Sequence, residues 1–535
     1  MKKSIIYISY LFFAALAVSS CKKQLDVTPR QSIEVPQVFT SKDNINAAIT
    51  GIFSRLKSAR LYGRDLFAVS EALSENGFAT NKSGRLINEA ANVPGAHFVN
   101  WQQNYFSIAE INTLLVRIPG IVLVPAITPA ERAAWEGQLY FLRALNYHDL
   151  ARTYCYEPGI GIPGQDRGGI PIVTATPLSI EGAVANLPVR SSIDDVYKRI
   201  YGDLDSCLIR LTNISLNTPA LPSLSAAQAL YARVALYRGD YTRAIAMANL
   251  SLVPVIGRLT TASGYTSGWT SQIHPESLFE VRFANPAENI GVNESLQTTY
   301  TTLKDRGIPT VVQGFGDLVA TGSPTLGGLL SQLGFSGFSL NGNGGGFSGR
   351  TDDVRNLLFE TGSTARGPAR IECTKFIGKN GQANLDNVPL IRIPEVLLTR
   401  AEAYANATNR DGTANAGYSL SNAMLDVIRL KQNRYSSYAT TQSPADVTLQ
   451  ASINPVPVLN EILRQRRIEF AMEGQRWFDY KRTAGYTFII PAVPNVSPAI
   501  NVLTSKIAYT DFRILPAIPQ REIDLSSNLT QNFGY

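Results

Sequence analysis

Apolar residues recur every three or four positions along much of the chain, the spacing that lines one side of an α-helix. Ile45, Ile49 and Ile52 show this spacing, and Ser41 stands where a helix-capping residue is expected. The same pattern recurs at residues 101–115, 128–147 and 192–208. Thr128, Pro129 and Glu131 form a capping-box sequence with proline at the first helical position. The pattern predicts a mainly α-helical protein.

Two segments look like pairs of antiparallel helices. In residues 225–252, small and apolar residues line two helical stretches, and Gly239-Asp240 interrupts them. Small residues let two helices approach closely, as in tetratricopeptide repeats. Residues 394–404 and 420–430 form a second candidate pair. Because the pairs are far apart in sequence, we expect a scaffold of scattered tetratricopeptide-like helical pairs and not a regular array.

Helical periodicity fades between residues 255 and 390, where glycine, threonine, serine and asparagine become frequent. Residues 334–349, GFSGFSLNGNGGGFSG, are typical of a long loop. Long loops on a rigid scaffold often carry function, although a plain surface insertion has the same composition. We therefore expect a loop-rich, irregular C-terminal part next to the helical scaffold.

The N-terminus has the pattern of a lipoprotein signal peptide. Lys2 and Lys3 precede an apolar run at residues 5–18, which is shorter than the about 20 residues that span a bilayer. Small residues then lead to Cys21, the pattern of a lipobox, although an ordinary secretory signal beside an incidental cysteine is the alternative. The expected division is a signal peptide at 1–20, a helical region at 21–254 and a region at 255–535 with long loops and a repeat-like helical pair.

Composition and motifs exclude several classes of function. A hydrophobic content of 44% and a charged content of 17% are typical of a globular protein. The net charge of +7 is scattered, so we expect no nucleic-acid partner. No cysteine or histidine spacing predicts a metal site, and no cofactor is expected. The glycines of a GxGxxG at residues 159–164 lack the preceding strand that a dinucleotide site needs, and no residue is predicted to be catalytic.

Several segments, in order, resemble the SusD/RagB family. They are KKQLDVTP at 22–29, LYFLRALNYHDLARTY at 139–154, GIPIV at 169–173, IRIPEVLLTRAEAYA at 391–405 and, most specifically, LRQRRIEFAMEGQRWFDYKRT at 463–483. The residues of the last motif have a structural interpretation. Buried arginines need acceptors, and Glu473 and Asp479 are suitable partners.

The resemblance implies a scaffold of four tetratricopeptide-like helical pairs with an irregular part packed on it. It also implies an outer-membrane lipoprotein, anchored through Cys21 and facing the cell exterior. Such a protein captures an oligosaccharide, or less often a peptide, and delivers it to a SusC-like TonB-dependent transporter. Two alternatives remain open at this stage, a surface glycan hydrolase and a helical-repeat scaffold without a small ligand.

Sugar binding uses aromatic rings against the pyranose faces and polar side chains for the hydroxyl groups. The resemblance implies that early and middle loops build the site. The candidate ligand-binding residues are Asn81, Arg85, Asn88, His97, Phe98, Tyr265, Trp269 and Tyr300. Trp101 and Trp135 lie in helical periodicity and are expected in the core.

Overall fold

The computed structural model describes residues 35–175, 181–182, 187–216, 218–306, 314–322, 328–338, 346–484 and 507–535. The predicted signal peptide and Cys21 lie outside the described residues. The described chain forms two compact units, one of residues 35–48 with 122–127 and one of the remaining residues.

The smaller unit contains α2 (Val35–Val38) and the first part of α3 (Lys42–Arg55). The Ser41 side-chain oxygen accepts the Asn44 backbone N–H at 3.1 Å, which confirms the predicted cap. The Asn44 side chain in turn donates to the Gln37 carbonyl at 2.9 Å and ties the two helices together.

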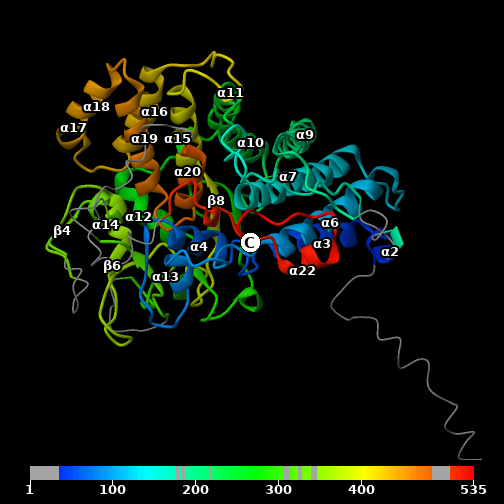
Figure 1. The fold of residues 1–535 in the computed structure, drawn as a ribbon, viewed down its shortest axis with the longest axis horizontal. Coiled ribbons are helices and arrows are strands. Elements are labelled where there is room, and N and C mark those ends of the chain that lie inside the picture. Colours follow the sequence, from blue (N-terminus) through cyan, green and yellow to red (C-terminus); the bar gives the residue numbers. More distant parts are fainter. Residues whose placement is uncertain are drawn as a thin grey trace, which may run out of the picture. The chain divides into compact units, whose positions relative to one another are not determined.

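The larger unit is built mainly from helices that stack one beside the next (Figure 1). Its first helices are α4 (Asp65–Leu73), α5 (Ile87–Ala90), α6 (Trp101–Arg117), α7 (Pro129–Tyr154), α9 (Ile193–Leu211), α10 (Leu224–Arg238) and α11 (Tyr241–Leu252). Its later helices are α12 (Tyr265–Thr270), α13 (Leu296–Tyr300), α14 (Leu329–Gln332), α15 (Ile393–Tyr404), α16 (Leu420–Gln432), α17 (Tyr438–Thr441), α18 (Ser443–Gln450), α19 (Pro455–Glu469), α20 (Arg476–Thr483) and α22 (Gln520–Leu525). From α6, the packing order runs through α7, α9, α10 and α11 to α15 and α16.

Local sequence signals explain where these helices begin and end. Thr128 and Glu131 form the predicted capping box at the start of α7, with Pro129 at the first helical position. Gly239 ends α10 in the left-handed conformation at φ 78°, and the Asp240 side chain caps α11 by accepting the Arg243 N–H. The predicted helical pair at 225–252 is therefore confirmed.

The second predicted pair is also confirmed, as α15 and α16. Small residues such as Ala401 and Ala423 let these helices pack closely, and α19 joins them in one apolar cluster. Helix α15 also packs against α10 and α11. Helices from before and after residue 255 therefore share one packed scaffold.

The strands of the described residues pair as four antiparallel two-stranded sheets. The pairs are β1 (Gly77–Ala79) with β3 (Leu318–Ala320), β2 (Ser277–Val281) with β8 (Val388–Arg392), β4 (Phe335–Ser336) with β5 (Gly349–Arg350), and β6 (Phe359–Thr361) with β7 (Ile371–Cys373). In the first pair, Gly77 opposes Ala320. The β4–β5 pair closes the base of the glycine-rich segment, whose residues 339–345 lie outside the described part.

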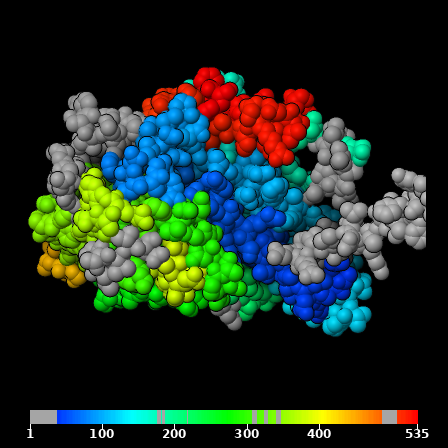
Figure 2. All heavy atoms as spheres, turned by 90° about the horizontal axis from the view of Figure 1, so that it is seen from below, coloured from blue at the N-terminus to red at the C-terminus, as the bar shows by residue number. Residues whose placement is uncertain are grey.

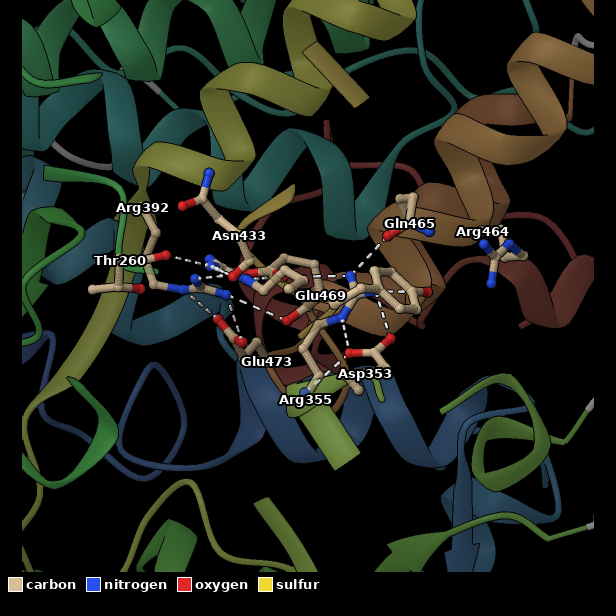
Figure 3. Close-up of polar contacts among 12 residues, drawn as sticks. Thr260, Asp353, Arg355, Arg392, Asn433, Arg464, Gln465, Glu469 and Glu473 are labelled. Carbon is tan, nitrogen blue, oxygen red and sulfur yellow. Dashed lines mark hydrogen bonds and ion pairs between the residues drawn. The ribbon is translucent and has the colours of Figure 1, made fainter. Parts of the chain in front are cut away.

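A buried ion-pair network joins the C-terminal helices to the strand-rich part (Figure 3). Glu469 lies 3.0 Å from Arg392 and 3.0 Å from Arg434, and all three side chains are 2% exposed or less. Four cations of the network contact four carboxylates: Arg355, Arg392, Arg434 and Lys375 against Asp353, Glu276, Glu469 and Glu473. This pairing balances the charges that burial would otherwise penalise.

The two carboxylates expected to satisfy buried arginines do so. Glu473 accepts from Arg392 at 2.8 Å, and Asp479 accepts from Arg466 at 2.9 Å. Burial alone would raise the pKa of Asp479, but Arg466 and Arg482 outweigh it and lower the pKa to about 2. The motif at 463–483 therefore has a structural role, because its charged side chains form buried ion pairs.

The predicted fold class is confirmed, a mainly α-helical scaffold with tetratricopeptide-like pairs and a loop-rich part. Within the described residues, no helix combines the length and apolar character that crossing a bilayer requires.

Candidate functional site

A pocket of about 300 Å³ lies among the loops at the start and middle of the larger unit. Figure 2 shows the face on which early segments, in blue, border middle segments, in green. The lining residues that carry its chemistry are Arg60, Arg64, Asp65, Arg85, Asn88, Glu89, His97, Thr299 and Asp317. They come from the turn before α4 and the first residue of that helix, the segment 84–99, the end of α13 and the residue before β3. Residues far apart in sequence thus meet at one polar cavity.

The wall between β1 and α6 has a strained backbone. The non-glycine residues Asn81, Leu86 and Asn92 have φ values of 60°, 61° and 49°. The left-handed region disfavours side chains other than glycine, although asparagine tolerates it better than leucine. A strained backbone conformation persists only where surrounding contacts impose it, and such conformations are common at functional sites. It is a physical reason to regard this wall as a ligand-binding segment.

Ion pairs hold the charged side chains of the pocket in place. Asp65 accepts from Arg64 at 2.7 Å and from Arg60 at 3.1 Å. Arg85 contacts Asp317 at 3.1 Å, and this carboxylate is 1% exposed. Because the buried carboxylates are already paired, the arginines and the exposed Asn88 side chain provide the hydrogen-bonding groups nearest to solvent.

Burial sets the protonation of the remaining titratable groups. Burial, with the nearby Lys481 charge, lowers the pKa of His97 to about 3, so its imidazole is neutral near pH 7. Burial also raises the pKa of Glu89. The His97 ring packs against Phe98 and Trp477, with centroids 5.1 Å and 5.6 Å away.

The structure brings three of the predicted ligand-binding residues together. Arg85, Asn88 and His97 all line the pocket. Asn81 is exposed on the same loop, two residues after the end of β1. Phe98 is only 2% exposed and stacks on Phe478 at 5.2 Å, so it supports the wall from beneath.

The three aromatic residues predicted from the middle region lie elsewhere. Tyr265, Trp269 and Tyr300 have no exposed surface. The Trp269 ring packs on Phe376 at 6.0 Å, with the Arg392 guanidinium 5.3 Å from its centroid. A ring without exposed surface offers no face to a ligand in this structure, and these residues form part of the core.

Other pocket residues were not singled out from the sequence. Arg60 and Arg64 are four residues apart in a turn, and their spacing does not predict a cavity. Thr299 and Asp317 reach the pocket only through the pairing of β1 with β3 and the packing of α13 on β3. The one local signal is the pair of arginines shortly before helix α4, whose residues are all buried.

The pocket can bind polar groups by hydrogen bonding. Guanidinium, amide and hydroxyl groups suit a ligand rich in hydroxyl or anionic oxygens. Among the described residues, no group of three or more histidine, cysteine or carboxylate side chains is placed to hold a metal ion.

The fold and pocket define a class, a helical-repeat protein whose loops form a polar binding cavity. Two family models match the chain, one described as "SusD family" at residues 364–535 and one as "Starch-binding associating with outer membrane" at residues 23–236. The chain is thus similar to the SusD family over its C-terminal part, and to a SusD-like family over its N-terminal part.

Individual relatives agree with this assignment. The chain is 22% identical to SusD-like protein P38 of Formosa agariphila over 89% of this chain and 91% of that one. It superposes on a SusD superfamily protein of Bacteroides thetaiotaomicron with a TM-score of 0.69, at 22% identity and over 92% of this chain and 99% of that one. A laminarin-binding SusD-like protein matches with a TM-score of 0.57, at 18% identity and over 93% and 100% of the two chains.

Proposed function

We propose that this protein is a lipid-anchored, outward-facing outer-membrane protein that captures a glycan in the pocket and delivers it to a SusC-like TonB-dependent transporter. The observation that carries the proposal is the polar pocket built on a strained loop, with Arg85, Asn88 and His97 in its lining. The family description, starch binding in association with the outer membrane, supports the same role. So does the laminarin binding of one structural relative.

We assign ligand contact to the polar side chains of the wall. Asn88 and Arg85 would bind hydroxyl groups, His97 would contribute its neutral ring, and Asn81 would lie at the rim. A peptide ligand would use the same polar groups. A peptide has fewer hydroxyl groups for this donor-rich cavity, so the glycan is the better fit.

The experiment for the site is a glycan-binding titration on the full-length protein. Asn88→Ala removes an exposed amide, so binding should weaken several-fold, on the order of 1 kcal/mol, without change in stability. Asn422→Ala is the matched control, because Asn422 is an exposed asparagine on α16, outside the pocket lining. Equal affinities for both variants and the wild type would refute this location.

Capture and not catalysis is the proposed activity. Incubation of the purified protein with mixed glycans and peptides should leave their size distribution unchanged. Product release that survives repurification, and that is lost in a pocket variant, would establish a hydrolase instead.

The anchor and the transporter are tested in cells. Cys21→Ala should release a soluble protein or leave an unprocessed precursor, since an acyl chain supplies the membrane affinity. Gentle detergent extraction should recover the wild type with a large β-barrel protein, and deletion of that barrel should abolish uptake but leave surface capture. Recovery as a lone monomer, with uptake unaffected by the deletion, would contradict the transporter partnership.

A further inference from the structure

The β6–β7 hairpin brings an exposed arginine to an aromatic ring beside the pocket. The guanidinium carbon of Arg366, in the segment between the two strands, lies 4.3 Å from the centroid of the Phe315 ring. The Arg85 guanidinium lies 4.7 Å from the same ring. Phe315 precedes Asp317 by two residues, and both Arg85 and Asp317 line the pocket. The hairpin therefore extends the charged surface of the pocket outward.

A second arginine–aromatic contact lies next to the first. Arg370, which directly precedes β7, lies 5.5 Å from the ring of Phe78 on β1. Strand β1 pairs with β3, and β3 packs against β7, so the two contacts occupy one small area. The Gly362 N–H donates to the Arg370 carbonyl at 2.8 Å and closes the hairpin that carries both arginines.

The carboxylates of this area already have partners. Glu372 accepts from Lys82 at 3.2 Å and from the Thr302 hydroxyl at 2.8 Å. Asp317 accepts from Arg85 at 3.1 Å. Arg366 and Arg370 form no ion pair with any described residue, and the undescribed stretches 307–313, 323–327 and 339–345 contain no aspartate or glutamate. Two positive charges therefore have no carboxylate partner among the described residues.

The contacts with aromatic rings prepare these arginines for anion binding. A ring face holds the planar guanidinium group in place and leaves its N–H edge free for hydrogen bonds. A carboxylate or sulfate group accepts two such bonds side by side, and each is stronger than a bond to a neutral hydroxyl. A neutral sugar would leave both charges uncompensated.

We propose that the arginines of the β6–β7 hairpin, Arg366 and Arg370, bind an acidic sugar residue, so that the ligand of this protein is a glycan carrying carboxylate or sulfate groups. This inference rests on the proposed function, because it names the class of glycan that the pocket receives. The shared chemistry is the anionic oxygen pair, and the two sources are uronate and sulfate ester.

The test compares matched polysaccharides that differ only in charge. One pair is polygalacturonate and its methyl ester, and the other is κ-carrageenan and its desulfated form. Binding of each is measured by affinity electrophoresis and calorimetry with the wild type and the double variant Arg366→Gln, Arg370→Gln. Arg243→Gln is the matched control, an exposed arginine 5.5 Å from the Tyr231 ring on the helical scaffold. Circular dichroism checks that each variant is folded.

The wild type should bind at least one acidic polymer about tenfold more tightly than its neutralised form at low ionic strength, with the difference shrinking as salt screens the charges. The double variant should lose this preference, and Arg243→Gln should keep it. The pair that shows the effect identifies uronate or sulfate as the source.

Three outcomes would overturn the inference. Equal binding of charged and neutralised polymers, unaffected by the double variant, refutes it and leaves glycan capture standing. A preference for acidic polymers that survives in the double variant refutes the assignment to the hairpin. A folded wild type that binds none of the four polymers refutes both the inference and the proposed function.

Discussion

The helical pair α10–α11 and the pocket wall between β1 and α6 follow different physical rules. In the pair, Ser223 and Asp240 cap the helices, glycine occupies the left-handed position, and small residues fill the contact. In the wall, Leu86 and two asparagines adopt left-handed conformations. In the first region, contacts between near neighbours in the sequence favour the observed conformation of each residue. The second keeps its shape only because distant segments hold it, and that is the condition expected of a binding site.

The buried ion-pair network joins the C-terminal helices to the strand-rich part, and its removal should have the largest effect. Glu469→Ala removes one of the two carboxylates that Arg392 and Arg434 share, the other being Glu276, and leaves buried positive charge in excess, so the unfolding free energy should fall by about 3–5 kcal/mol. Denaturant unfolding measures the change. Lys198→Ala is the control, because this side chain is 66% exposed and forms only a surface pair, whose loss should be small. A Glu469→Ala protein as stable as the control would show that the network does not hold the two parts together.

A core aromatic should behave differently from a pocket residue. Trp269→Ala removes a ring with no exposed surface, so stability should fall by about 3–5 kcal/mol while the folded fraction keeps its glycan affinity. Thermal unfolding and a binding titration on the same sample separate the two effects. If Trp269→Ala weakened glycan binding without lowering the unfolding temperature, Trp269 would be a ligand-binding residue and not a core residue.

Glu71, a buried residue on α4, should make stability depend on pH. It accepts the Gly474 N–H and the Asn76 amide, each at 2.9 Å, and burial raises its pKa to about 7. Because the folded state holds this proton more tightly than the unfolded state, the stability that the protonated form contributes is complete below about pH 4.5 and is lost as pH rises through 7. Glu71→Gln should therefore gain stability relative to the wild type between pH 5 and pH 8, roughly the window that this shift sets. The free energy of unfolding of both proteins is measured by denaturant unfolding across this pH range. A constant difference between the two at every pH would contradict this prediction.

The smallest expected effect concerns the strained wall itself. At Asn81, glycine should leave stability nearly unchanged, whereas valine should cost about 1–2 kcal/mol because a β-branched residue fits the left-handed region poorly. Denaturant unfolding of the pair measures the difference. Equal stability of Asn81→Gly and Asn81→Val would mean that this backbone is not restrained as the structure indicates.

The same contrast explains what the sequence could predict. Caps, turns and the helical pairs depend on neighbours within a few residues, so Ser41, Thr128 and Gly239 indicated their elements correctly. Arg85, Asn88 and His97 became candidates because the family resemblance implies that early loops build the site, and no pattern in the residues themselves marks them.

The positions of the other pocket and core residues depend on contacts between segments that are distant in the sequence. Trp269 is buried because Phe376 and Arg392 surround it, and both are more than 100 residues away in the chain. Asp317 reaches the pocket through the pairing of β3 with β1. Neither relation leaves a pattern within a short window of sequence, and a residue type alone does not distinguish a platform for sugar from a core aromatic.

Hydrogen exchange of the full-length protein, with and without a polysaccharide that it binds, tests the central claim most directly. A ligand in the pocket should slow exchange of backbone amides in residues 80–99 and in the described residues 293–306 and 314–317, and should leave α15, α16 and α19 unchanged. Protection confined to those helices, or found only at surfaces remote from the pocket, would contradict the account.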